Sequence, residues 1–160
     1  MDTDEIREVL NDPVARELLE APIVTRLAYT GLDGSPRVIP IAFSWDGARL
    51  LLGTVPSAPK VRAIKRDPRV AATIDTDTDP PHVLLIRGEA TIQVVDGVLP
   101  EYLDAAKRRY DPERYAAFEA GVRGLYRQMA RIAITPTWAK VLDFETRLPK
   151  PVEDLIRQQG

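Results

Sequence analysis

The chain has 160 residues with 44% apolar content, which is enough for one packed domain spanning 1–160. Its 22 basic and 24 acidic residues leave a net charge of −2, so we expect neither nucleic acid nor a membrane surface as a partner. The chain has no cysteine, one histidine (His82) and no long uninterrupted apolar stretch, which excludes disulfides, thiolate metal sites and cysteine nucleophiles and predicts a cytoplasmic protein.

The N-terminal segment 1–20 has apolar residues at helical spacing and a break at Asp12-Pro13, which predicts one or two short helices. β-branched and aromatic runs then predict strands, which the turn signals "GLDGS" and Asp46-Gly47 join as hairpins. The expected strands are 23–30, 36–45 and 48–54, paired as an antiparallel meander.

Further along, the pattern predicts a short helix at 58–66, a helical region at 100–128 broken at Asp111-Pro112, and a tail at 146–160. The remaining expected strands are 69–75, 82–95, 129–136 and 137–145. Antiparallel strands with helices in their connections predict a mainly β, α+β fold built on a small β-barrel.

The stretch "DTDTD" at 75–79 alternates acids as a calcium loop does, but Pro80 and Ile86 stand where such a loop needs glycine and glutamate. His82 has no second histidine or cysteine to complete a metal site. We therefore predict a solvated hairpin loop, a structural histidine and no metal.

The segment 53–71, "GTVPSAPKVRAIKRDPRVA", carries five cations against one anion. Ser57 is the expected N-cap of the short helix, and Pro59 and Lys60 fall in its first turn, where free N–H groups and the helix dipole attract anions. A cation at this end opposes the dipole, so Lys60 suits a bound phosphate better than it suits helix stability. An ordinary solvated basic helix is the alternative.

Pro40 interrupts an otherwise regular strand and withholds a donor from the ladder, which predicts an edge or a bulge. Gly53, at the end of the next strand, marks a point where a ligand or another backbone can approach closely. A ragged barrel rim explains both residues equally well. Trp138 is a candidate for stacking on a cofactor or substrate, although a tryptophan on a strand more often belongs to a core or an interface.

Three stretches in this order, "LAYTGLDGSPRVIPIAF", "LLLGTVPSAPKVRAIKRDPRVA" and "IRGEATI", resemble the pyridoxamine 5′-phosphate oxidase-like, flavin-binding split-barrel family over residues 15–145. The resemblance implies a six-stranded antiparallel split barrel, usually a homodimer, with FMN or the deazaflavin coenzyme F-420 in a groove at the subunit interface. It also implies cofactor-binding positions, with Thr54 and Ser57 near the ribityl phosphate and Lys60 paired with it. The others are Arg37, Val38, Ile39, Pro40 and Ile41 along the ring system, and Gly53 in the loop region.

Ala42 stands where oxidases acting on pyridoxamine phosphate carry a phosphate-binding lysine, and the ending "DFETRLPKPVEDLIRQQG" lacks their basic substrate-reading segment. The chain looks more like the actinobacterial reductase-like branch, in which deazaflavin users are common. Because hydride moves at the flavin ring, few catalytic side chains are needed. We expect an FMN- or F-420-dependent oxidoreductase acting on a small molecule. A non-catalytic flavin- or haem-binding module is the alternative, and nucleic-acid binding through 60–69 is a weaker third.

Overall fold

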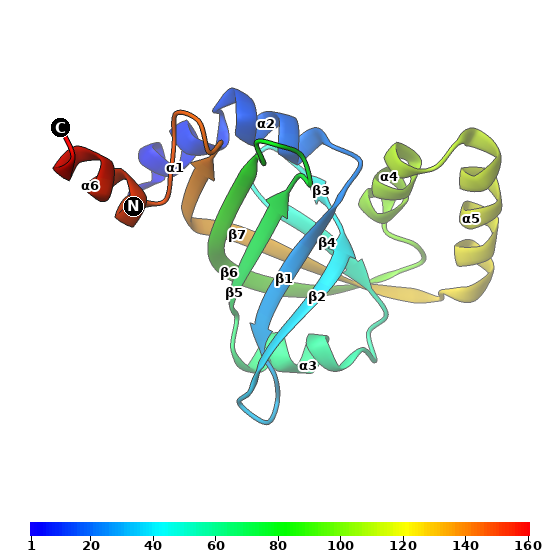
Figure 1. Ribbon diagram of the computed structural model, residues 1–160. Coiled ribbons are helices and arrows are strands. Elements are labelled where there is room, and N and C mark those ends of the chain that lie inside the picture. The colour runs from blue at the N-terminus through cyan, green and yellow to red at the C-terminus, as the bar shows by residue number, and fades with distance from the viewer.

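The computed structural model describes all residues, 1–160, and confirms the mainly β, α+β class (Figure 1). The strands are β1 Val24–Thr30, β2 Pro36–Ala42, β3 Ser44–Trp45, β4 Leu50–Thr54, β5 Arg69–Asp75, β6 Val83–Asp96 and β7 Gln128–Leu142. The helices are α1 Thr3–Leu10, α2 Pro13–Glu20, α3 Pro59–Arg66, α4 Pro100–Arg109, α5 Pro112–Leu125 and α6 Lys150–Gln158.

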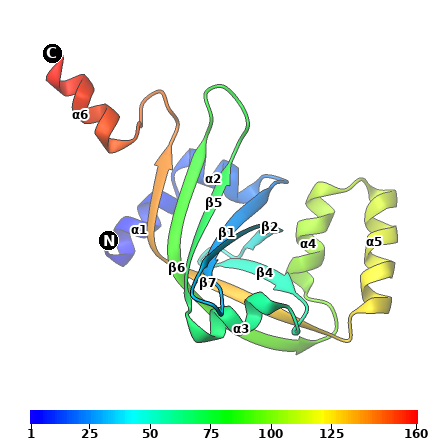
Figure 2. The ribbon, with the colours of Figure 1, turned by 60° about the horizontal axis from the view of Figure 1, so that its bottom comes forward.

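All seven strands form one antiparallel sheet in the order β2-β1-β5-β6-β7-β4-β3, which curls into a split barrel whose end strands do not pair (Figures 1 and 2). The resemblance implied six strands, and the sequence pattern predicted 36–45 as a single strand. The split-barrel fold agrees with the resemblance, with seven strands in place of six, whereas the prediction of 36–45 as one strand is wrong because the strand breaks at Phe43. Arg108 of α4 donates a hydrogen bond to the Phe43 carbonyl at 2.5 Å, so that carbonyl is not available to a strand ladder, and the chain crosses to the other end of the sheet. The expected meander is therefore interrupted, and β4 pairs with β3 and β7 instead.

The two C-terminal strands expected at 129–136 and 137–145 are one strand, β7, with a bulge at Thr137. Arg87 of β6 pairs with Trp138 and Gly88 with Pro136, which leaves Thr137 as the extra residue on β7. Pro136 has no N–H to donate, which fits an irregularity at this point. A side chain at position 88 would place its Cβ 2.4 Å from a β7 carbonyl, so the close approach of the two strands requires glycine there.

Helices close both ends of the barrel. α2 lies over one end and buries Leu18 and Leu19 completely, while α3 lies across the other end and buries Ile64 (Figure 1). The predicted break at Asp12-Pro13 is confirmed, because Asp12 caps α2 with its carboxylate. The strand side chains fully buried between these helices are Leu27, Leu50, Leu52, Ile74, Leu84, Ile86, Ile132 and Ile134. None of the helices is long and apolar enough to cross a bilayer.

The segment expected as a tail, 146–160, contains α6, which projects away from the barrel (Figure 2). The loop before it is pinned by Arg147, whose guanidinium bonds Asp12 at 2.6 Å and Asp143 at 3.1 Å. The Thr146 hydroxyl and backbone N–H groups bonded to Asp143 hold the pKa of that carboxyl well below its usual range. The root of the C-terminal segment is therefore fixed to the junction of α1 and α2.

Candidate functional site

The free edge of β2 carries two prolines, and the strand register explains why the sheet tolerates them. Gly31 N donates to Ser35 O at 2.8 Å in the β1–β2 turn, which sets the alternation of the hydrogen-bonded pairs. Counting from this pair, every second residue of β2 from Arg37 onward directs its backbone N–H and C=O groups toward β1. The residues between them turn their backbone groups to the open edge; these are Pro36, Val38 and Pro40. The edge position predicted for Pro40 is confirmed. This edge presents carbonyl oxygens and the N–H of Val38 to whatever lies beside it.

The side chains of β2 divide between the two faces of the sheet. Ile39 and Ile41 pack against the barrel core, so they contribute only backbone to a ligand outside. Val38 and Pro40 point outward, and Val38 is 67% exposed, which is unusual for a valine on a strand. The stretch predicted to lie along a ring system is therefore an exposed strand edge with an apolar outer surface.

The start of α3 differs from the sequence prediction. Ser57 is exposed and does not cap the helix: the N-cap residue is Ala58, which has no side-chain acceptor. Ser57 instead lies within the turn that Ala58 N closes on Val55 O at 3.1 Å, one residue too early for a cap. Pro59 occupies the first helical position as expected. The N–H groups of this first turn are left without a side-chain partner.

Lys60 follows directly in that first turn and points toward the end of β4. Its Nζ lies 3.3 Å from Thr54 Oγ1, and no carboxylate neutralises it. Burial of the ammonium lowers the pKa of Lys60 below the usual lysine value. A half-buried cation at a helix start is unfavourable for the empty protein, and a bound anion would relieve this cost.

Arg37 lies near the same helix but is engaged by its own hairpin. Its Nη2 donates to Asp33 Oδ2 at 2.8 Å, and this bond lowers the pKa of Asp33. Arg37 and Asp33 line a cavity of about 230 Å³ together with Pro59 and Ala63 of α3. The guanidinium is therefore next to the start of α3, although an approaching anion would have to compete with Asp33 for it.

Gly53 is approached closely by side chains of α4, of its N-cap residue and of β7 rather than left open. A Cβ at this position would lie 3.0 Å from Tyr102 Cδ2, and 3.2 Å from both Leu99 Cδ1 and Met129 Cε. The sequence predicted that a ligand or another backbone could approach Gly53 closely, whereas the structure places side chains there, from α4, its N-cap residue and β7. We therefore treat the cofactor contact expected for Gly53 as indirect: it lets α4 pack beside Thr54.

A largely buried ion pair holds α4 in this place. Glu101, at the start of α4, pairs with Arg131 of β7, and Arg131 also donates to Gln93 Oε1 at 2.9 Å. Burial raises the pKa of Glu101, but the hydrogen bonds and charge of Arg131, together with a backbone hydrogen bond and the charge of Arg49, lower it by more, so the net pKa is lowered. Ser44 Oγ donates to the Glu101 carbonyl at 2.9 Å, so the same turn of α4 also ties down β3.

Trp138 does not lie with the other predicted cofactor residues within one chain. On β7 it is eight residues from Ala130, the partner of Thr54, which is about 26 Å along a strand. It lies on the outer face of the sheet, where the Arg87 guanidinium stacks 4.3 Å from its ring centre. A role for Trp138 at the same cofactor would require a second subunit.

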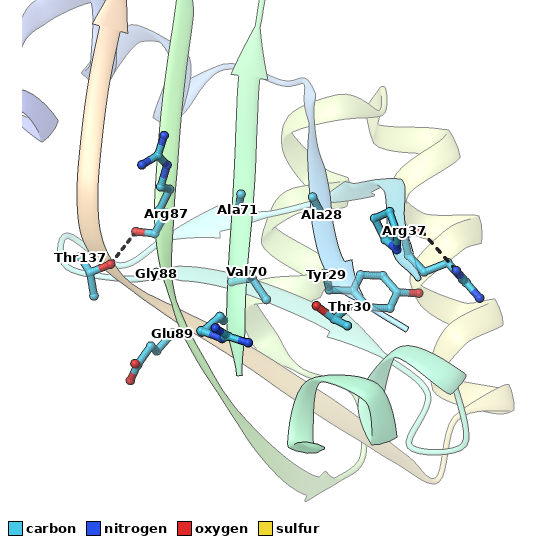
Figure 3. Close-up of a pocket in the computed structure, with 12 residues that line it drawn as sticks. Ala28, Tyr29, Thr30, Arg37, Val70, Ala71, Arg87, Gly88, Glu89 and Thr137 are labelled. Atoms are coloured by element: carbon cyan, nitrogen blue, oxygen red, sulfur yellow. Dashed lines mark hydrogen bonds between the residues drawn. The ribbon is translucent and has the colours of Figure 1, made fainter. Parts of the chain in front are cut away.

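That outer face holds an open depression of about 540 Å³ over β1, β5 and β6 (Figure 3). Small residues form its floor, including Ala28, Ala71 and Gly88, and Arg87 and Glu89 stand on its β6 side (Figure 3). No helix covers this face in either ribbon view (Figures 1 and 2). Sequence reasoning missed the depression, because its floor is assembled from three strands that are distant in sequence.

An antiparallel barrel whose end strands do not pair, with α2 and α3 lying across its two ends, is the architecture of a split-barrel protein. Residues 11–138 match the family described as Pyridoxamine 5'-phosphate oxidase, and the chain belongs to this family. No curated protein matches the chain.

Solved structures share the fold. An F420 reductase is 29% identical, with a TM-score of 0.59 over 78% of this chain and 94% of its own. The conserved hypothetical protein Rv2991 from Mycobacterium tuberculosis is 22% identical, with a TM-score of 0.56 over 93% of this chain and 89% of its own. The haem storage protein HutZ from Vibrio cholerae is 16% identical, with a TM-score of 0.58 over 81% and 93%. The last two likenesses establish the fold alone.

Proposed function

We propose that this protein is an oxidoreductase that uses FMN or the deazaflavin coenzyme F-420 and acts on a small molecule. The observation that carries the proposal is Lys60, a half-buried cation without a carboxylate partner at the uncapped start of α3. Family membership and the likeness to an F420 reductase support the same cofactor class. Both cofactors carry phosphate, which is the anion that this helix start would accept.

The residues present fit a flavin phosphate. Lys60 would supply the charge and Thr54 a hydroxyl beside it. In the first turn of α3, Pro59 has no N–H and the Val61 N–H donates to the Ala58 carbonyl at 2.9 Å, so the Lys60 N–H is the backbone donor left for the phosphate. Ser57, exposed in the preceding turn, is free to donate its hydroxyl to the same phosphate. Arg37 would join when it leaves Asp33.

The open edge of β2 would hold the ring system. The Val38 N–H and the carbonyls of Pro36 and Pro40 suit the polar rim of a flavin ring, while the exposed Val38 side chain supplies apolar contact. The bound flavin would supply hydride transfer, and the protein would bind and orient the reactants. No side chain of this groove is required as a general acid or base.

Oxidation of pyridoxamine phosphate itself is not the activity that we propose. Ala42 ends β2 and offers no cation where the oxidases of that substrate carry a lysine. The C-terminal segment forms α6, whose two cations are paired with its own acids rather than free for a substrate. The substrate is therefore a different small molecule.

A non-catalytic flavin- or haem-binding module remains the second candidate, because the fold is shared with a haem storage protein. The only imidazole argues against a haem in the proposed groove. His82 precedes β6 at the Asp75 end of the sheet, whereas α3 joins the Arg69 end, about 20 Å away along β5. His82 Nδ1 also lies 3.5 Å from a Glu17 carboxylate oxygen, which gives the ring a structural partner.

We also propose a homodimer that uses the uncovered outer face of the sheet. Arg87 and Glu89 stand on this face on either side of Gly88, and neither pairs with an opposite charge in its own chain. A two-fold axis that crosses β6 at Gly88 would set Arg87 of each copy against Glu89 of the other.

Titration of the purified protein with FMN and with F-420, followed by absorbance and fluorescence, tests the proposal. Binding of one of them with turnover under a reductant is expected. Binding without turnover on any reductant and acceptor pair would favour the module, and no binding of either would refute the cofactor site.

A further inference from the structure

Helix α6 has an apolar face that nothing in its own chain covers. Val152, Leu155 and Ile156 are spaced to share one side of the helix and are 42%, 59% and 55% exposed. No residue of α6 is buried. A helix of nine residues is too short to be stable in water without packing, so this face points to an interaction.

The helix is presented in a fixed direction rather than on a free tail. Arg147 locks the preceding loop to Asp143 and to Asp12 at the α1–α2 junction. Glu153 accepts a hydrogen bond from Leu148 N at 3.3 Å, which fixes the first turn of α6 to the same loop. The apolar face is therefore held away from the barrel by specific contacts.

The figures place α6 on the side of the uncovered sheet face. Figure 2 is turned so that parts near the viewer in Figure 1 move upward. Helix α6 and the β5–β6 hairpin both lie higher in Figure 2, whereas the N-terminus lies lower. Helix α6 and the hairpin therefore lie on the viewer's side of the molecule in Figure 1. The outer faces of β5 and β6 look toward the viewer in Figure 1. A second copy seated on that face would therefore meet α6.

We infer that the apolar face of α6 packs on the second copy of this chain in a dimer formed through the outer sheet face. This inference rests on the proposed homodimer. Three side chains on a short helix bury far less than the roughly 800 Å² per partner of a stable interface, so α6 extends a larger contact instead of recruiting a separate protein. A membrane is a poor alternative, because the two cations of α6, Lys150 and Arg157, are balanced by its acids Glu153 and Asp154.

Sedimentation equilibrium of the full chain tests the inference. Leu155→Asp should weaken dimerisation at least tenfold, because each dimer contains two such contacts. Lys150→Gln, which changes the net charge equally on the opposite side of the helix, should leave the dimer constant within about twofold. At a concentration where both proteins are monomeric, circular dichroism should give the same melting temperature for Leu155→Asp and the wild type, since Leu155 is exposed within its own chain.

A second measurement reads the contact directly. Because the chain has no cysteine, Gln158→Cys provides a unique position for a spin label. Labelled chains mixed with isotope-labelled chains should broaden amide signals of the isotope-labelled partner. A wild-type dimer that Leu155→Asp does not weaken, or a mixture without broadening, overturns the role of α6 alone. A monomeric wild type overturns both this inference and the proposed homodimer.

Discussion

The Lys60 ammonium lies 3.3 Å from the Thr54 hydroxyl, and no carboxylate stands near it. If this cation binds a cofactor phosphate, Lys60→Ala should lose about 1.5–3 kcal/mol of binding, which is on the order of ten- to a hundredfold in affinity. The melting temperature should stay level or rise, because removing a half-buried cation from a first helical turn relieves an unfavourable interaction. Titration with FMN and F-420 and thermal melts measure the two effects.

The matched control for that variant is Lys65→Ala in the last turn of α3. Lys65 is exposed and makes no hydrogen bond or ion pair, so its loss should leave affinity unchanged. Arg66 is a poorer control, since its Nη1 donates to the Leu32 carbonyl at 2.7 Å and holds the β1–β2 turn against the helix. Equal affinity of the Lys60 and Lys65 variants would mean that α3 is only a solvated basic helix.

The lowered pKa of Lys60 gives the site a pH dependence. The charged form binds phosphate, so affinity should be complete below the pKa of Lys60 and lost as the pH rises through it. Because burial lowers this pKa, the loss should begin at a lower pH than for an ordinary lysine. Lys60→Arg, which keeps its charge throughout, should bind with an affinity that is level over the same range. A wild-type profile as flat as that of the arginine variant would contradict the role of the ammonium.

Much of this site follows from the sequence because local rules fix it. Pro40 could be placed at an edge because its missing N–H is incompatible with a central strand, and Pro59 at the first turn of α3 for the same reason. The N-cap was predicted one residue early, at Ser57, because Ala58 has no side-chain acceptor that would mark it as a cap. The turn closed by Ala58 N on Val55 O sets where the helix begins. Local patterns therefore locate the helix start but not its cap.

Tertiary contacts that the sequence does not encode locally account for the other errors. The break of the strand 36–45 at Phe43 depends on Arg108, which is 65 residues away. The cover over Gly53 depends on Tyr102 of α4, and the separation of Trp138 from Thr54 depends on the register between β4 and β7. Such relationships require the assembled barrel.

Gly53→Ala separates two explanations of that glycine. If α4 packing requires it, the added methyl group meets Tyr102, Leu99 and Met129 and should destabilise the fold by about 1–3 kcal/mol, which is roughly 2–10 °C in melting temperature. Affinity for the cofactor should fall much less than in Lys60→Ala. Denaturant unfolding and cofactor titration measure the two effects. An alanine variant of wild-type stability that has lost its affinity would instead mean that the cofactor itself approaches Gly53.

The charges on the outer sheet face predict a reciprocal mutational pattern. Arg87→Glu alone and Glu89→Arg alone should each weaken dimerisation, by roughly two- to thirtyfold for two exposed ion pairs worth about 0.2–1 kcal/mol apiece. The double variant restores opposite charges across the two-fold axis and should recover most of the loss. Light scattering over a concentration series measures this, with Arg62→Glu on α3 as a control for net charge. Additive losses in the double variant would rule out the proposed pairing of Arg87 with Glu89.

The Asp143–Arg147 contact predicts how stability depends on pH. The Thr146 hydroxyl and the backbone N–H groups that bond the Asp143 carboxylate hold the pKa of Asp143 below the usual value of 3.8. The charged carboxylate therefore stabilises the folded protein above pH 3.8, and this contribution is lost as the pH falls below that value. The same direction holds for Asp12: burial raises its pKa, but the bond and charge of Arg147 together with the backbone N–H donors of α2 lower it by more. Asp143→Asn should therefore lower the melting temperature by a few degrees at pH 7 and by progressively less below pH 4. Asp154→Asn, whose carboxylate pairs only with Lys150 and Arg157 of α6 itself, should leave the melting temperature unchanged at both pH values. A gap between wild type and Asp143→Asn that stays constant down to pH 2 would mean that the carboxylate charge is not what fixes the root of α6.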